Sequence, residues 1–345
     1  MDAIYINELT IQLVKMFALA LGAFLLTMAI TPVYTFAAYR YRFWKKPRTT
    51  TTTGELSKVF SKLHEAKHRR HIPTMAGIVF VFVILFVTVV ANYSTRQTLL
   101  PMLALLGGAV VGLIDDIINI RGNGNGVAGL RSSIKFGLIL LVSAVSAWYF
   151  YYKLGYTGIN VPFIGEWQIG LWIIPLFIVT AVTTSNAVNI SDGLDGLAGG
   201  LLIMAYGFFA VIALLQGNYG IAGFCLTVVG ALLSYTWFNI YPARFFMGDV
   251  GSFALGMGLG VVAMLTDTLF LLPVIGFVFV LEGGSSLLQV LSKKIRHKKI
   301  FLIAPIHHHF EACGWPEVKV TMRFWVIGGV MGFIGLLLAL MGGYI

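Results

Sequence analysis

The sequence predicts an all-α polytopic membrane protein, folded as a single integral-membrane domain over residues 1–345. Three observations carry this prediction: 58% of the residues are hydrophobic, only 11% are charged, and the apolar residues form long runs. A water-soluble domain usually carries about 25% charged residues, and about 20 apolar residues cross a bilayer as a helix. Most of the chain is therefore expected to have lipid as its solvent.

About ten runs are apolar enough to be transmembrane helices. They cover residues 16–36, 74–93, 99–114, 134–152, 169–188, 197–215, 221–238, 251–265, 269–291 and 324–344. The third and eighth runs are short, so their boundaries are approximate. The ninth contains Pro273 and the sequence Glu282-Gly283-Gly284, and we expect a kink at that Gly pair.

The Lys and Arg residues are distributed unevenly between the connections. Ten spans place both termini on one side, and almost every Lys and Arg lies in the connections of the other side. The exceptions are Lys15, Arg96 and Lys153, out of 24 in total. The positive-inside rule then predicts that both termini lie outside and that the chemistry lies at the cytoplasmic face. The same asymmetry explains the net charge of +10 without a nucleic-acid partner.

Two adjacent carboxylates, Asp115 and Asp116, close the third run. Carboxylates at a membrane boundary are costly unless they are paired or bind a cation, and Mg²⁺ prefers carboxylate oxygens together with substrate phosphates. A solvated helix end is an equally open interpretation of this pair alone.

A second acidic motif follows the fifth run, where Asn189, Asp192 and Asp195 lie between two helices and each Asp precedes a Gly. Glycine lets the backbone approach a ligand closely, and the next helix directs free amides at the loop, which suits an anion. The alternative is ordinary Asp-Gly turn formation with helix capping.

A third acidic motif follows the seventh run and contains Asn239, Phe246 and Asp249. Phe246 offers a flat surface on which a base can stack, an interaction worth about 1–3 kcal/mol. An interfacial aromatic anchor is the alternative for Phe246. The turn that carries Asp249 has Gly on both sides, and Asp249 adds a further possible cation ligand.

The last basic connection contains His307, His308 and His309. Three consecutive side chains diverge and no Cys cluster is near, so a zinc site is not expected. Imidazoles beside phosphates, as donors or acid–base groups, fit better. Upstream lie Lys293, Lys294, Arg296, Lys298 and Lys299, which also suit lipid headgroups. Together, the motifs predict a nucleotide diphospho-sugar meeting a lipid phosphate.

At this point the motifs resemble a known family. Asp115-Asp116 and the stretches 186–198 and 246–252 resemble the polyprenyl-phosphate N-acetylhexosamine-1-phosphate transferases, as does the stretch 73–77. The segment 305–323 is most similar to members that act on UDP-N-acetylmuramoyl-pentapeptide. The resemblance runs from about residue 16 to the C-terminus.

The resemblance implies transfer of phospho-N-acetylmuramoyl-pentapeptide from its UDP conjugate to undecaprenyl phosphate, which gives lipid I and UMP in peptidoglycan synthesis. It further implies Mg²⁺, a homodimer, and a multi-pass location in the bacterial inner membrane. Two rival functions remain. One is transfer of N-acetylglucosamine phosphate to the same lipid, which the segment 305–323 disfavours. The other is a nucleotide-sugar or lipid transporter, although its charged residues would be expected near mid-membrane.

Carried onto this sequence, the resemblance implies that Asp249, with Asp115 and Asp116, holds Mg²⁺ and the phosphates. It implies that the three His residues are catalytic. It implies a substrate-binding set of Arg69, Thr74, Lys135, Asn189, Asp192, Asp195, Asn239 and Phe246. Two positions depart from the family pattern, since Asn119 and Arg69 stand where Lys is usual.

The expected mechanism is direct attack of the lipid phosphate oxygen on the sugar-linked phosphorus. The resemblance offers Asp115 as a general base, although a phosphate near pH 7 is already largely ionised because its second pKa is about 6. A covalent Asp intermediate is the two-step alternative.

Overall fold

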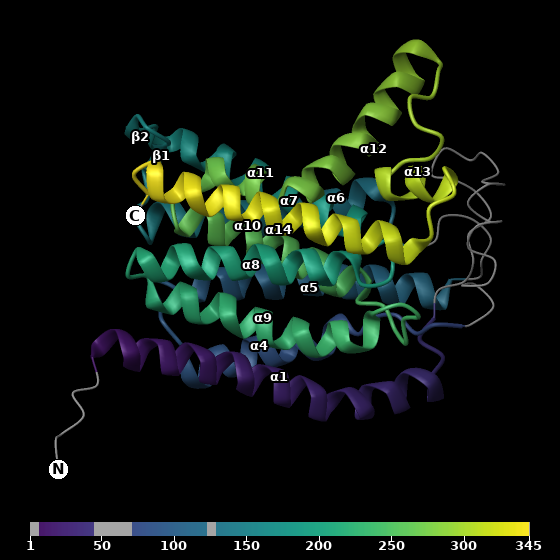
Figure 1. The fold of residues 1–345 in the computed structure, drawn as a ribbon, viewed down its shortest axis with the longest axis horizontal. Coiled ribbons are helices and arrows are strands. Elements are labelled where there is room, and N and C mark those ends of the chain that lie inside the picture. The colour runs from purple at the N-terminus through teal and green to yellow at the C-terminus, as the bar shows by residue number, and fades with distance from the viewer. Residues whose placement is uncertain (1–6, 45–70, 123–128, 345) are drawn as a thin grey trace.

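Long helices lying side by side make up the computed structural model, which describes residues 7–44, 71–122 and 129–344 (Figure 1). The helices are α1 (Glu8–Arg40), α4 (Gly77–Ala91), α5 (Leu99–Arg121), α6 (Ser132–Tyr152), α7 (Ile173–Ser191), α8 (Leu197–Leu215), α9 (Tyr219–Asn239), α10 (Gly248–Leu265), α11 (Leu272–Ile275), α12 (Phe277–Arg296), α13 (Ile306–Ala312) and α14 (Glu317–Met341). Two 3-10 turns, η1 (Gly170–Trp172) and η2 (Leu269–Leu271), and one antiparallel hairpin, β1 (Gly158–Val161) with β2 (Gly165–Gln168), complete the described part.

The all-α membrane fold is confirmed. Among the described helices, eight are long and apolar enough to span a bilayer, and a ninth span results if one bent pair is counted together. The shorter apolar helix α4 has 15 residues. Each of the ten predicted runs falls on one of these helices or on the bent pair.

The predicted kink is found in a different place. The ninth span bends by 82° between Leu269–Ile275 and Phe277–Arg296, at Gly276, whereas Gly283 and Gly284 lie inside the continuous helix α12. A Gly inside a helix costs only about 1 kcal/mol, which is too little to break α12 by itself. The expectation that the span bends at Gly283-Gly284 is therefore wrong.

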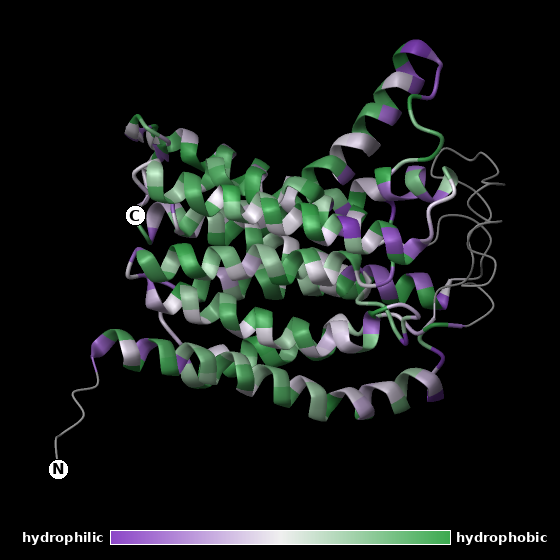
Figure 2. Cartoon of the chain, in the orientation of Figure 1, coloured by the Kyte–Doolittle hydropathy of each residue, from purple (hydrophilic) through white to green (hydrophobic). Residues whose placement is uncertain are grey.

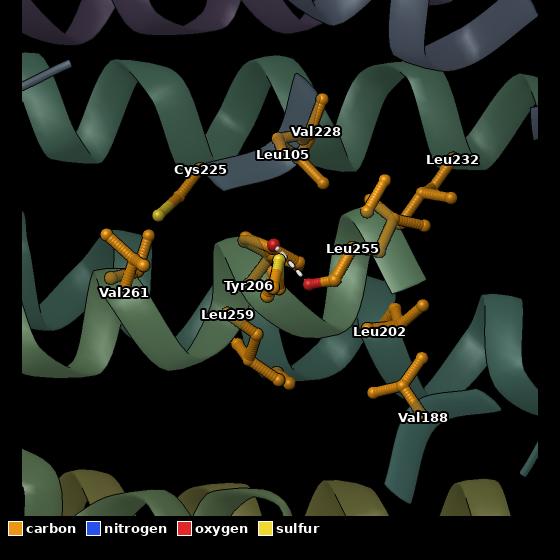
Figure 3. Packing of buried hydrophobic residues seen from close by; sticks show 14 of the residues in the cluster. Leu105, Val188, Leu202, Tyr206, Cys225, Val228, Leu232, Leu255, Leu259 and Val261 are labelled. Atoms are coloured by element: carbon orange, nitrogen blue, oxygen red, sulfur yellow. Dashed lines mark hydrogen bonds between the residues drawn. The ribbon is translucent and has the colours of Figure 1, made fainter. Parts of the chain in front are cut away.

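Helix α10 lies at the centre of the bundle, and 94% of its span is buried. Figure 3 shows its Leu255 and Leu259 among side chains of the neighbouring helices, and Tyr206 of α8 donates a hydrogen bond to the Leu255 carbonyl oxygen at 2.8 Å. A Cβ at Gly112 of α5 would overlap the backbone of Asp249. Glycine at this position therefore lets α5 bring its carboxylates to the start of α10.

The polar residues gather at one end of the bundle, around α13 and the tip of α12, while the middle is apolar (Figure 2). The start of α1 and the end of α14 lie at the opposite end of the bundle (Figure 1). This arrangement is the one expected for an even number of spans. The assignment of the polar end to the cytoplasm stays a prediction.

Candidate active site

Two carboxylates meet one ammonium group where α5, α6 and α10 come together. Lys135 Nζ lies 2.8 Å from Asp115 Oδ2 and 2.9 Å from Asp249 Oδ2, and it lies 5.3 Å from the ring centroid of Phe253. The backbone N–H of Leu130 donates to Asp115 Oδ1 at 2.6 Å. The Asp115 side chain is 1% exposed, against 15% for Asp249 and 24% for Lys135. The cluster therefore reaches the surface through Lys135 and Asp249.

Asp116 has a different environment from its neighbour. Its residue is fully buried, and its Oδ2 accepts the backbone N–H of Val250 at 3.1 Å. This bond caps the positive N-terminus of α10, and a Cβ at Gly248 would overlap the same carboxylate. Asp116 thus holds the turn that carries Asp249. Because α5 continues to Arg121, the carboxylate pair lies inside a helix and is not at its end.

The 192–196 loop is tied to its surroundings by buried polar groups. Asp195 Oδ2 accepts the N–H of Ala243 at 2.9 Å, and Asn239 Oδ1 accepts the N–H of Gly196 at 3.0 Å. Asp195 and Asn239 are each 2% exposed. Both side chains therefore position loops in this structure, and their predicted contact with the nucleoside stays untested.

Asn189 and Asp192 lie at the end of α7. Asn189 Nδ2 donates to Ser252 Oγ of α10 at 2.8 Å, and Asp192 is the C-cap residue of α7. Asn189 is thereby placed one turn of α10 away from Asp249.

Thr74 and Phe246 belong to two segments that pair through their backbones. The N–H of Phe246 donates to the Pro73 carbonyl at 2.9 Å, and Ala76 donates back to the Phe246 carbonyl at 3.1 Å. Thr74 is 3% exposed and Phe246 is half-buried, so of the two only Phe246 has surface for a ligand. Arg69 lies outside the described residues.

The three His side chains have separate hydrogen-bond partners, but the rings of His307 and His308 pack edge to face with centroids 4.1 Å apart, so the expectation that all three diverge does not hold for this pair. His307 Nδ1 lies 2.7 Å from Glu282 Oε2, and His308 Nδ1 lies 2.7 Å from Glu311 Oε2. His309 Nδ1 accepts the Leu302 N–H at 3.3 Å. The pKa of His308 is lowered to about 4, mainly by burial and to a lesser degree by the neighbouring His307. His308 is therefore neutral at pH 7.

Glu282 and Glu311 are site residues that the sequence reasoning missed. Glu282 was taken as part of a helix break, yet an ionisable residue inside an apolar run is by default a candidate functional residue. That signal was present in the sequence. Glu311 carried no comparable signal, because only the fold shows that it faces His308.

The carboxylates fit a hard cation. In the described part of the chain, no three His, Cys, Asp or Glu residues converge as a metal site. Mg²⁺, however, usually takes one or two carboxylates, with water and substrate phosphates as its other ligands. Asp115 and Asp249 both contact the single Lys135 Nζ, so the two carboxylates lie close together on either side of the ammonium group, and each has a second oxygen.

An apolar groove of about 590 Å³ lies between α7 and the bent span formed by η2, α11 and α12, with α10 at its base. Its walls include Val179, Val182 and Ile190 of α7 and Phe279, Val280 and Leu287 of α12. Ile190 adjoins Asn189, whose side chain contacts α10 beside the Asp249 turn. The α7 wall of the groove therefore ends beside Asn189, which contacts α10 one turn after Asp249.

Comparison with known proteins gives the same family as the motifs. Residues 98–267 match the model of glycosyl transferase family 4. A phospho-N-acetylmuramoyl-pentapeptide-transferase of Chloroflexus aurantiacus is 40% identical over 339 residues, covering 94% of this chain and 89% of the relative. The enzymes of the same name from Chloroflexus aggregans and Clostridium novyi are 38% and 40% identical, over 94% and 79% of this chain and 89% and 84% of the relatives. The chain therefore belongs to the phospho-N-acetylmuramoyl-pentapeptide transferases of glycosyl transferase family 4.

Proposed function

We propose that the protein transfers phospho-N-acetylmuramoyl-pentapeptide from its UDP conjugate to undecaprenyl phosphate, releasing UMP and forming lipid I for peptidoglycan synthesis. The observation that carries this proposal is that a charged cluster and an apolar groove both involve helix α10. A charged cluster of Asp115, Lys135 and Asp249 lies at the start of α10, and helix α7, which walls the apolar groove, contacts α10 one turn further on through Asn189. A diphosphate suits the first and a polyprenyl chain suits the second, and the motifs and relatives supply the identity of the sugar.

The reaction needs an anion to approach a diphosphate. An oxygen of the lipid phosphate attacks the sugar-linked phosphorus, the bond from that phosphorus to the bridging oxygen breaks, and UMP leaves with the bridging oxygen. Lys135 is placed to offset the repulsion between the phosphates, because its ammonium group is half-buried between acids that keep it charged. Asp116 and Asn189 act by holding the turn and helix around Asp249.

Mg²⁺ is proposed as the cofactor, with Asp249 and Asp115 as its protein ligands. When bound, it would neutralise phosphate charge and orient the diphosphate. Asp249 is the more accessible of the two carboxylates. Binding of Mn²⁺, followed by electron paramagnetic resonance in the absence of substrate, tests this ligand assignment independently of turnover.

UMP release by the purified protein in lipid nanodiscs tests the function. Wild type is given undecaprenyl phosphate with either UDP-N-acetylmuramoyl-pentapeptide or UDP-N-acetylglucosamine. We expect UMP and lipid product with the first donor only. Efficient use of UDP-N-acetylglucosamine alone would change the substrate and keep the family, whereas substrate uptake into sealed proteoliposomes without UMP release would favour a transporter.

The membrane arrangement completes the proposal. We place both termini outside, the charged cluster at the cytoplasmic face of the bacterial inner membrane, and two chains in a homodimer. Labelling of a Cys introduced at Gly122 or Gly158 tests the orientation, because only Gly158 should react from outside intact cells. Mass measurement in nanodiscs tests the homodimer.

A further inference from the structure

Helix α12 has two faces that contact different parts of the protein. One face is polar, and all of its members are buried: Glu282, Ser285, Gln289 and Ser292. The other face is apolar and lines the groove through residues that include Val280 and Leu287. A single helix therefore separates the proposed lipid site from the segment that carries the three His residues.

The polar face binds the chain segment that returns from the tip of α12 to α13. Gln289 Oε1 accepts the N–H groups of Ile300 at 3.0 Å and Phe301 at 3.1 Å. Ser285 Oγ accepts the N–H of Ile306, the first residue of α13, at 3.0 Å. Because these bonds are distributed along the helix, α12 and the returning segment form one unit.

Glu282 extends this unit to the site. Its Oε2 lies 2.7 Å from His307 Nδ1, and both residues are 0% exposed. The other carboxylate oxygen, Oε1, has no hydrogen-bond partner among the described residues, so His307 is the group that Glu282 orients. Removing one member of a buried pair is costly because the other is left without compensation.

His307 in turn supports the 192–196 loop. A Cβ added at Gly193 would overlap the His307 ring at Nε2, so the imidazole packs directly against this glycine. The same loop is fixed from another side, where Glu317 Oε1 accepts the N–H of Asp195 at 2.7 Å. The position of His307 therefore bears on the loop that carries Asp192.

We propose that Glu282 is a positioning residue that couples occupancy of the apolar groove to nucleotide affinity at the 192–196 loop. A prenyl chain in the groove holds α12 in place, α12 holds His307 through Glu282, and His307 holds Gly193. Such coupling is reciprocal between the two ligands. The inference rests on the proposed function, which names those ligands.

The measurement is the Kd of UMP for the protein in nanodiscs, with and without undecaprenol. Undecaprenol fills the groove but carries no phosphate, so it neither reacts nor repels the nucleotide. We expect undecaprenol to lower the Kd of wild type about five-fold or more. Catalytic turnover is measured separately with the UDP donor and undecaprenyl phosphate.

Three variants locate the coupling. Glu282→Ala should reduce the effect of undecaprenol to near one-fold, while Glu282→Gln should retain it, because an amide oxygen still accepts from a His307 Nδ1–H. Gly193→Ala should also abolish the effect of undecaprenol, because it disturbs the contact between the loop and His307 without changing α12. This variant keeps the test valid if Glu282→Ala fails to fold. Asp267→Asn, at the opposite end of the bundle, is the control that should behave as wild type.

A UMP affinity that does not respond to undecaprenol in wild type, or a response that survives in Gly193→Ala or in folded Glu282→Ala, would overturn the proposal. Normal turnover, together with a UMP Kd that does not respond to undecaprenol, would refute the coupling and leave the proposed function intact. A UMP Kd that responds to undecaprenol, without any turnover of the UDP donor, would refute the proposed function and leave the coupling intact.

Discussion

Helices α10 and α12 both carry residues of the site, but they are held in place differently. Almost all of α10 is buried among neighbouring helices, so Asp249 starts from a rigid position. Helix α12 projects from the bundle beyond the 82° bend, and buried polar bonds hold only one of its faces (Figure 1). Apolar packing therefore fixes the position of α10, and the polar residues at its start do not have to. In α12, the buried polar residues themselves fix the position of the helix.

The largest expected effect is at the packed helix. Asp249→Asn should lower UMP release at saturating substrates by about 100-fold or more, since it removes an anionic ligand of the proposed Mg²⁺, whose charge offsets that of the reacting phosphates. The melting temperature should change little, because Asp249 is partly exposed and α10 is held by its packing. Near-wild-type turnover with an unchanged Mg²⁺ requirement would give Asp249 a structural role instead.

The adjacent carboxylates Asp115 and Asp116 are expected to affect different properties, turnover and stability. Asp116→Ala should lower the free energy of unfolding by about 1–2 kcal/mol, because the N-terminus of α10 loses its cap. Asp115→Ala should mainly reduce turnover. Thermal unfolding and UMP release, measured on both variants, should separate the two residues, and equal loss of stability would contradict the distinction.

The groove side of α12 offers a smaller effect. A Cβ at Gly284 meets no atom within 4 Å, so Gly284→Leu can fill the groove without displacing the helix. We expect the KM for undecaprenyl phosphate to rise about five- to ten-fold, equivalent to about 1–1.4 kcal/mol, with the KM for the UDP donor changed far less. Gly22→Leu on α1, which also meets no atom, is the matched control. Equal rises in both KM values would contradict occupancy by lipid.

The smallest effect lies in the turn that follows the last residue of α10, at the end of that helix away from Asp249. Burial raises the pKa of Asp267 to about 6, so its stabilising contribution is complete below the unfolded pKa of about 4 and is lost as pH rises through 6. Asp267→Asn should therefore reduce the fall in melting temperature between pH 5 and 7. At this half-exposed site the gain at pH 7 is expected to be about 1 kcal/mol or less. An unchanged pH profile would contradict this account.

Sequence patterns were sufficient for the parts of the fold that depend on local composition. All ten apolar runs fall on helices, and the Asp115, Asp192 and Asp249 motifs gather around the start of α10. Whether a carboxylate bonds a helix terminus or faces substrate depends on contacts distant in sequence. The different roles of Asp115 and Asp116 could thus be assigned only from the structure, because the role of Asp116 depends on its hydrogen bond with Val250.

The bend of the ninth span was misplaced for a similar reason. Two consecutive glycines suggest a break, but Gly283 and Gly284 leave room for a groove while the helix continues. The role of Glu282 also depends on a partner 25 residues away. Arg69 remains a prediction, because it lies outside the described residues.

The apolar groove is built between membrane-spanning elements, so a polyprenyl substrate would reach it by moving sideways within the bilayer. Its supply is then set by the mole fraction of that lipid among all lipids, not by moles per litre of buffer. Adding inert phospholipid at constant substrate should slow turnover by surface dilution, while the same addition should leave the response to the water-soluble donor unchanged. Kinetic constants for the two substrates consequently belong on different concentration scales.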